Sequence, residues 1–156
     1  MIASCVRKCN FSLCTCVEKC KHQAFLCVEK CRVMKRKIYT QLISWKNQER
    51  HKPLILNGVR QCGKTYILKE FGRKEFENLA YISCDRNENL HAIYSGDFDT
   101  SRIIRGLSAL TGVDIIPGKT LIFLDEVQAF PQALEALKYF CEDVPEYHIV
   151  VAGSLL

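Results

Sequence analysis

A glycine-rich loop in the first half of the chain contains the residue types that hold phosphate. It matches the pattern GxxxxGK[ST], and its eight residues are Gly58, Val59, Arg60, Gln61, Cys62, Gly63, Lys64 and Thr65. The glycines let the backbone curl without Cβ clashes, so that successive N–H groups can point at one anion. Lys64 would then reach the β- and γ-phosphates, and the Thr65 hydroxyl would bind Mg²⁺. The pattern predicts a site for a nucleoside triphosphate with magnesium.

The segments on either side of this loop predict the elements that must position it. Residues 53–57 form a short apolar stretch that predicts a strand, with its proline at the strand start. Residues 65–71 predict a helix, which we expect Gly72 to end. A strand, a loop and a helix in this order place the loop N–H groups at the positive end of the helix. These flanks favour phosphate binding over a chance match in a surface loop.

Two carboxylates follow a second apolar stretch. Residues 120–124 predict a strand that is buried on both faces, and Asp125 and Glu126 come directly after it. This is the form of a Walker B segment, in which Asp125 would hold Mg²⁺ and Glu126 would polarise the attacking water. The alternative is that the two carboxylates open the following helix, where negative charge is favourable. Their place after a phosphate-binding loop favours the catalytic interpretation. Gln128 either helps to place water or is simply solvated.

A third candidate lies at the end of the sequence. Residues 147–152 predict a last strand, which runs into Gly153 and Ser154. In ATPases with an Asp-Glu Walker B, the adjacent strand typically ends in a polar residue near the γ-phosphate, the sensor-1 position. Ser154 fits that position, and the alternative is a plain Gly-Ser turn.

The remaining segments predict alternating helices and strands. Residues 36–49 predict an amphipathic opening helix, residues 79–84 a strand, and residue 131 the start of another helix. Residues 99–101 would cap a helix that Gly112 closes, whereas residues 86–98 are polar and give no clear pattern. This alternation predicts an α/β fold, a doubly wound parallel sheet with its ligand site at the carboxyl ends of the strands.

Composition excludes some classes of function. The 156 residues are 48% hydrophobic and 25% charged, as in an ordinary globular domain. No apolar run approaches the ~20 residues of a membrane span, and no apolar secretory signal is present, so we expect a cytoplasmic protein without a membrane partner. Residues 34–156 hold 16 Lys/Arg and 15 Asp/Glu. This near-neutral balance does not support nucleic acid binding.

The first 33 residues form a separate unit by composition. They hold seven of the ten cysteines, and the pattern Cys-Val-x-Lys-Cys recurs at residues 5–9, 16–20 and 27–31. In a helix, each cysteine pair would lie on one face, and thiolates could bind Zn²⁺ or Cu(I). We favour a helical or disordered extension that is not part of the fold, with metal binding as the alternative. The three cysteines outside this unit are expected to be reduced, and Cys62 is either an oxidation-sensitive thiol or a spacer in the loop.

Three segments together resemble a group of bacterial and archaeal AAA-type ATPases of the P-loop NTPase class. The loop in this group often reads G-x-R-Q-x-G-K-T, the Walker B D-E-[IV]-Q, and the fourth strand ends in G-S. The matching segments here are residues 58–65, 123–128 and 152–156. The resemblance covers residues 34–156 and implies an ATPase core that precedes a helical lid and a nuclease-like C-terminal domain.

The resemblance also implies ligands, partners and roles. ATP and Mg²⁺ would bind, and the β–γ phosphoanhydride would be hydrolysed, with Lys64 stabilising charge, Glu126 handling water and Ser154 sensing the γ-phosphate. It implies a homo-oligomer or another partner that supplies an arginine finger. No fifth strand, lid, second sensor or candidate arginine finger follows Ser154. We therefore expect the front portion of such an ATPase, with slow or absent hydrolysis.

Two other functions fit part of the pattern. A small-molecule kinase could use the same loop, but a kinase must exclude water, whereas Asp125 and Glu126 resemble a pair that activates it. A Cys-rich metal-binding module on a degenerate nucleotide-binding fold is the second alternative. A GTPase is disfavoured because the sequence has no NKxD motif for reading guanine.

Overall fold

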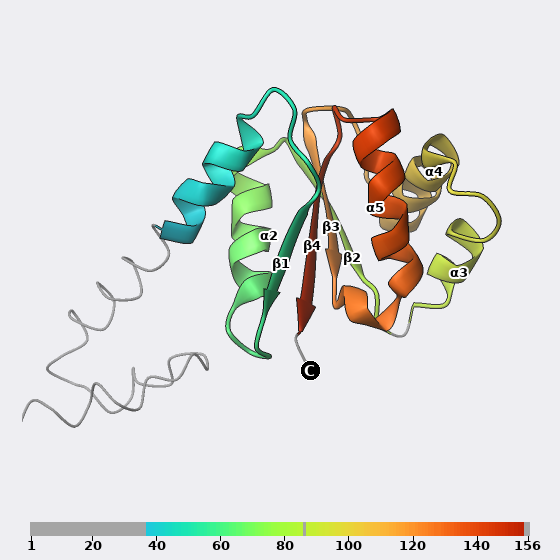
Figure 1. Cartoon of the computed structure of the whole chain (residues 1–156), viewed down its shortest axis with the longest axis horizontal. Helices are drawn as coiled ribbons and strands as arrows, with labels where there is room; N and C mark the ends of the chain where they lie inside the picture. The colour runs from blue at the N-terminus through green and yellow to red at the C-terminus, as the bar shows by residue number, and fades with distance from the viewer. Residues whose placement is uncertain (1–36, 86, 155–156) are drawn as a thin grey trace, which may run out of the picture.

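The computed structural model describes residues 37–85 and 87–154. Its framework is a sheet of four parallel strands in the order β1-β4-β3-β2. The strands are β1 (Leu54–Gly58), β2 (Asn78–Ser83), β3 (Thr120–Asp125) and β4 (His148–Ser154). Because the strands are parallel, their carboxyl ends lie at one edge of the sheet, where the C-terminus is labelled in Figure 1. The N-terminal repeat of residues 1–33 lies outside the described residues.

Helices cover both faces of this sheet. Residues 37–46 are helical and pack with α2 (Lys64–Glu75) on one face (Figure 1). The other face packs against α4 (Thr100–Thr111) and α5 (Pro131–Asp143), with α3 (Asn89–Ile93) beside α4. Every residue of β3 and β4 is buried, as expected of central parallel strands. Along β3, Leu121 and Phe123 pack toward α2, while Ile122 and Leu124 pack toward α4 and α5. The prediction of an α/β fold with a parallel sheet is confirmed.

The predicted end of the helix after the loop is wrong. Helix α2 continues through Gly72 to Glu75, and Phe76 then adopts an extended backbone while its N–H donates to the Gly72 carbonyl at 3.2 Å. A Cβ atom on Gly72 would lie 2.7 Å from Leu79 Cδ1 and 3.1 Å from Leu121 Cδ2. Gly72 therefore allows the helix to approach the sheet closely, and it does not act as a helix stop.

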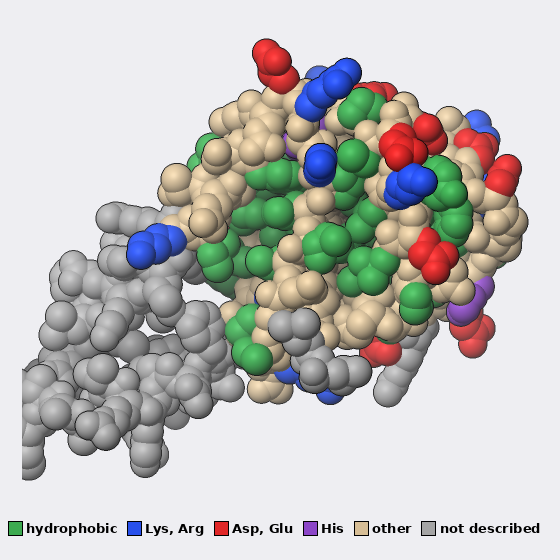
Figure 2. Space-filling view, in the orientation of Figure 1, with side chains coloured by type: hydrophobic (Ala, Val, Ile, Leu, Met, Phe, Trp, Pro, Cys, Tyr) green, Lys and Arg blue, Asp and Glu red, His purple; other side chains and the backbone are tan. Residues whose placement is uncertain are grey.

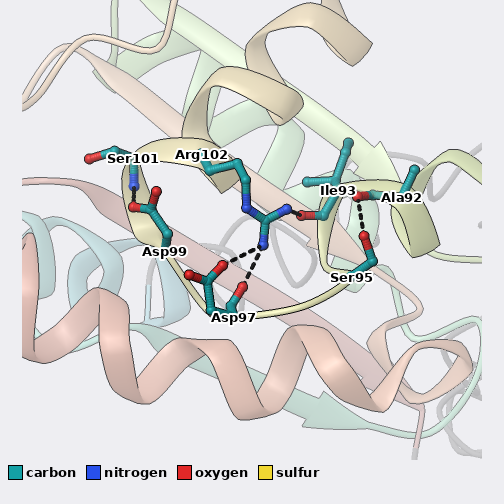
Figure 3. A network of polar contacts seen from close by, with 7 residues as sticks. All are labelled: Ala92, Ile93, Ser95, Asp97, Asp99, Ser101 and Arg102. Atoms are coloured by element: carbon teal, nitrogen blue, oxygen red, sulfur yellow. Dashed lines mark hydrogen bonds and ion pairs between the residues drawn. The ribbon is translucent and has the colours of Figure 1, made fainter.

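The segment that gave no clear pattern is organised by an arginine. Figure 3 shows Arg102 of α4 reaching back across the loop that follows α3. Its guanidinium donates to the Ile93 carbonyl at 2.7 Å, to the Asp97 carbonyl and to the Asp97 carboxylate at 3.3 Å. The predicted cap is confirmed, because the Asp99 carboxylate accepts the Ser101 N–H at 3.0 Å. Gly112 closes α4 with a φ of 67°, also as predicted.

Strand β1 lies at an edge of the sheet and is covered on one face. Leu54 and Leu56 pack with α2, whereas Ile55 points to the other face and is 49% exposed. Figure 2 shows hydrophobic side chains gathered on the face that it displays, where β1 and β4 lie in front in Figure 1. Among the described residues, no helix is both long and apolar enough to cross a membrane.

Candidate functional site

The loop before α2 turns sharply and, among the described residues, leaves the amino end of this helix without a side-chain cap. Gln61 and Gly63 have left-handed backbones, with φ of 59° and 86°, which turn the chain sharply into the helix. At the start of α2, which lies in the described part of the chain, no side chain caps the helix and no acidic residue occupies the first turn. The first N–H groups of a helix have no carbonyl partner within it. This end of α2 can therefore receive an anion.

Lys64 lies across this loop. Its ammonium donates to the carbonyl oxygens of Gly58 at 2.9 Å and Val59 at 2.8 Å, and it lies 3.7 Å from Cys62 Sγ. These contacts hold the ammonium against the loop backbone. A phosphate oxygen would be a stronger, charge-assisted acceptor than a neutral carbonyl. The position suits a residue that transfers its hydrogen bonds from the loop to a phosphate.

Thr65 and Asp125 join the two candidate motifs, although sixty positions separate them in sequence. The Thr65 hydroxyl donates to Asp125 Oδ2 at 2.8 Å, and the Glu126 N–H donates to Asp125 Oδ1 at 3.0 Å. Asp125 is 4% exposed. Hydroxyl and carboxylate oxygens are the hard ligands that Mg²⁺ prefers. In residues 37–85 and 87–154, no three His, Cys, Asp or Glu side chains form a metal site.

Glu126 leaves the strand through a strained backbone. Its φ of 52° and ψ of 44° are left-handed, which costs a non-glycine residue roughly 1–3 kcal/mol. The chain then forms a short 3-10 helix, η2 (Val127–Ala129), before α5 begins at Pro131. Neither helix has an acidic residue in its first turn. Glu126 is the N-cap residue of η2, as the alternative of carboxylates at a helix start describes, but in the described part of the chain its side chain makes no capping hydrogen bond there.

Gln128 connects Glu126 to the end of β4. Its amide nitrogen donates to Glu126 Oε2, and its amide oxygen accepts the Ser154 N–H at 3.0 Å. The Ser154 hydroxyl lies 3.4 Å from the same Glu126 oxygen. Both ends of the Gln128 amide have protein partners, so the interpretation that Gln128 is simply solvated is wrong. Strand β4 includes Ser154, so the alternative of a plain Gly-Ser turn is also wrong.

The strand register brings these groups to one place. Gly58 pairs with Ser154 between β1 and β4, and Ser83 pairs with Asp125 between β2 and β3. A Cβ atom at Gly153 would lie 3.1 Å from Asn57 Oδ1 and 3.3 Å from Gln128 Oε1, so a glycine there makes room for both amides. All the predicted site residues lie on β1, α2, β3 and β4 or on the turns directly after these strands.

Burial and the negative charge of Asp125 raise the pKa of two neighbouring groups, Cys84 and Tyr81. Burial, followed by the negative charge of Asp125, raises the pKa of the Cys84 thiol to about 12. The same two causes raise the pKa of Tyr81. Cys84 therefore stays a neutral, buried thiol, and it is a free cysteine like Cys62 and Cys141. Among the described residues these three cysteines form no disulfide, and their reduced state stays a prediction.

Two residues of the site were not assigned from the sequence. Tyr81 donates its hydroxyl to Asp125 Oδ2 at 3.2 Å, and Asn57 packs its amide against Gly153. Both lie close to the carboxyl end of a strand, which is where a parallel sheet collects its ligand site. That position was available from the sequence, but the strand order that makes Tyr81 a neighbour of Asp125 was not.

A family model described as an AAA domain matches residues 50–156, a range that begins just before β1 and includes every candidate site residue. A search of the curated proteins finds no match.

Proposed function

Because the chain belongs to the AAA domain family, we propose that it binds ATP with Mg²⁺ at the carboxyl edge of its sheet and prepares the nucleotide for hydrolysis. Family membership makes it a nucleotide-binding AAA-type domain. The proposal adds the identity of the nucleotide, the metal and the roles of individual residues. The observation that carries it is the 2.8 Å hydrogen bond between Thr65 and Asp125, which joins the phosphate-binding loop to the Walker B strand.

The binding half of the proposal rests on α2 and its loop. The uncapped helix end and the loop N–H groups would surround the phosphates. Lys64 would move from the carbonyls of Gly58 and Val59 to the β- and γ-phosphates. Thr65 and Asp125 would hold Mg²⁺, Asp125 through water, and the ion would neutralise charge on the phosphates.

The chemical half rests on Glu126, Gln128 and Ser154. The Glu126 carboxylate would accept a hydrogen bond from the attacking water and orient it toward the γ-phosphorus. Gln128 holds that carboxylate through its amide nitrogen. Ser154, 3.4 Å from the carboxylate, would contact the γ-phosphate in the sensor-1 position. Positioning and electrostatic stabilisation are the main contributions expected of a protein to phosphoryl transfer.

Two measurements on the 156-residue chain test this proposal. Calorimetry with ATP and with GTP, each with and without Mg²⁺, should show tighter binding of ATP and a gain in affinity from the metal. Phosphate release at an excess of protein over ATP should be slow but measurable, with ADP and free phosphate as products. Transfer of phosphate to a small-molecule acceptor would favour the kinase alternative. Equal or tighter binding of GTP would contradict the choice of nucleotide.

A further inference from the structure

Tyr81 of β2 places its hydroxyl on the carboxylate oxygen that Thr65 also contacts. The Tyr81 hydroxyl lies 3.2 Å from Asp125 Oδ2, and the Thr65 hydroxyl lies 2.8 Å from the same atom. The other oxygen, Oδ1, accepts the Glu126 N–H at 3.0 Å. A carboxylate has about four lone-pair positions, so these three donors leave about one for a further partner. A water molecule bound to a metal ion is the partner that the proposed function supplies.

The direction of the Tyr81 hydroxyl is set by the packing of its ring. Tyr81 pairs in register with Phe123 of β3, and the two rings meet at 5.3 Å with an interplanar angle of 61°. The Lys69 ammonium of α2 lies 3.3 Å from the centre of the Tyr81 ring. An aromatic ring held by a neighbouring ring and a cation has little freedom to turn its hydroxyl elsewhere. The packing of the ring against Phe123 and Lys69 therefore directs the Tyr81 hydroxyl toward Asp125.

We propose that Tyr81 is a positioning residue that holds Asp125 in the orientation in which it binds Mg²⁺ together with ATP. This inference rests on the proposed function and deepens it. Residues that hydrogen-bond a metal ligand orient it, and losing such a residue typically weakens metal binding by about 10–100-fold. Tyr81 connects β2 to the site, whereas the loop and the Walker B strand are already joined through Thr65.

A test compares ATP affinity with and without Mg²⁺ in the wild-type chain and in Tyr81→Phe. The substitution removes the hydroxyl and retains the ring that packs on Phe123 and Lys69. Tyr39→Phe is the matched control, because the Tyr39 hydroxyl also donates to a carboxylate, Glu75 Oε1 at 2.7 Å, away from the loop. Calorimetry in Mg²⁺ and in EDTA gives the two affinities, and thermal unfolding checks that each variant is folded.

The expected result is specific to the metal. In Tyr81→Phe, the affinity for ATP in Mg²⁺ should fall on the order of tenfold, while the affinity in EDTA stays the same, and Tyr39→Phe should match the wild type in both. An unchanged Mg²⁺-dependent affinity in Tyr81→Phe would overturn the inference and leave the proposed function intact. An equal loss in Mg²⁺ and in EDTA would assign Tyr81 a structural role and also overturn it. Absence of ATP binding by the wild-type chain would overturn the proposed function, and the inference with it.

Discussion

Glu126 combines a strained backbone with a side chain held by two neighbours. A left-handed glutamate persists only where the surrounding contacts fix it, and such residues cluster at functional sites. Here the contacts are the Gln128 amide and the Ser154 hydroxyl. At the scale of single residues, this is the group whose replacement should separate binding from chemistry.

Glu126→Gln should keep ATP binding and lose hydrolysis. The amide preserves the shape of the side chain but cannot accept a proton from water, so the rate of phosphate release should fall roughly 10²-fold or more. Affinity for ATP with Mg²⁺ should stay within about twofold, since the phosphate contacts come from the loop. Single-turnover assays of phosphate release and calorimetry provide the two values. Phosphate release that survives the substitution at the wild-type rate would contradict the role given to Glu126.

The sequence identified the motifs of the candidate site, but not Tyr81 and Asn57 and not the contacts between the motifs. The spacing of residues 58–65 and the apolar run before Asp125 identify the motifs, because each motif is local in the chain. The contacts of Gln128 with Ser154 and of Tyr81 with Asp125 join segments 26 and 44 residues apart. Such contacts depend on strand order and on side-chain packing, which local patterns do not contain.

At the scale of elements, local signals gave the strands and most of the helix ends. Caps such as Asp99 and Gly112 act within one turn, so they are visible in the sequence. The prediction that Gly72 ends α2 was wrong, and the loop after α3 was not predicted. Gly72 serves contact with the sheet, and the loop is organised by Arg102 from the next helix. In both cases a tertiary contact decides the local structure.

The opening helix is attached to the sheet by a cluster of aromatic rings at the amino end of β4. The rings of His51 and His148 are stacked at 3.7 Å, and the edge of Trp45 packs against both. His148 is 8% exposed, its Nε2 lies 3.2 Å from the Lys46 carbonyl oxygen, and its buried Nδ1 has no partner among the described residues. Burial lowers the pKa of His148; the hydrogen bond with the Lys46 carbonyl opposes this effect, and electrostatic interactions with His51 and Lys46 add to it.

This cluster predicts a loss of stability in mild acid. Below pH ~6.5 the unfolded chain binds a proton at residue 148 that the folded chain resists, so the free energy of unfolding should fall as pH decreases from about 6.5 toward the lowered pKa. Above pH ~6.5 both states are neutral at this residue and its contribution is constant. Thermal unfolding between pH 7.5 and 5 measures the effect. His148→Phe should flatten this dependence, whereas His91→Gln, on the exposed side of α3, should retain it. An unchanged slope in His148→Phe would contradict this account.

At the scale of the whole molecule, the described helices cover both faces of the central strands, while one face of the edge strand β1 leaves Ile55 49% exposed. Two hydrophobic clusters, one on each face of the sheet, bury β3 and β4 between helices that all lie within residues 37–154. A sheet covered in this way needs no contribution from the cationic, Cys-rich repeat of residues 1–33. The repeat is therefore expected to be dispensable for nucleotide binding.

Deletion of residues 1–33, with the chain starting at Met34, tests this separation. Affinity for ATP with Mg²⁺ should stay within about twofold of that of the full chain. The thermal midpoint should shift by less than several degrees, which is the shift expected when the free energy of unfolding changes by about 1 kcal/mol. A large loss of either would mean that the repeat is part of the fold. Stoichiometric zinc in the full chain, lost in the variant Cys16→Ser plus Cys20→Ser, would favour a metal site in the repeat over a plain extension.

The central claim is that the loop of residues 58–65 holds the phosphates of ATP, and isothermal calorimetry of Lys64→Ala tests it most directly. The substitution removes the charge that would contact the β- and γ-phosphates, so affinity for ATP with Mg²⁺ should fall at least tenfold, about 1.4 kcal/mol. Lys74→Ala is the control, because Lys74 lies in the last turn of the same helix and its side chain is 60% exposed in an ion pair with Glu70. It should bind ATP like the wild-type chain. Equal affinity in the wild-type chain and in Lys64→Ala, with both folded, would contradict the account.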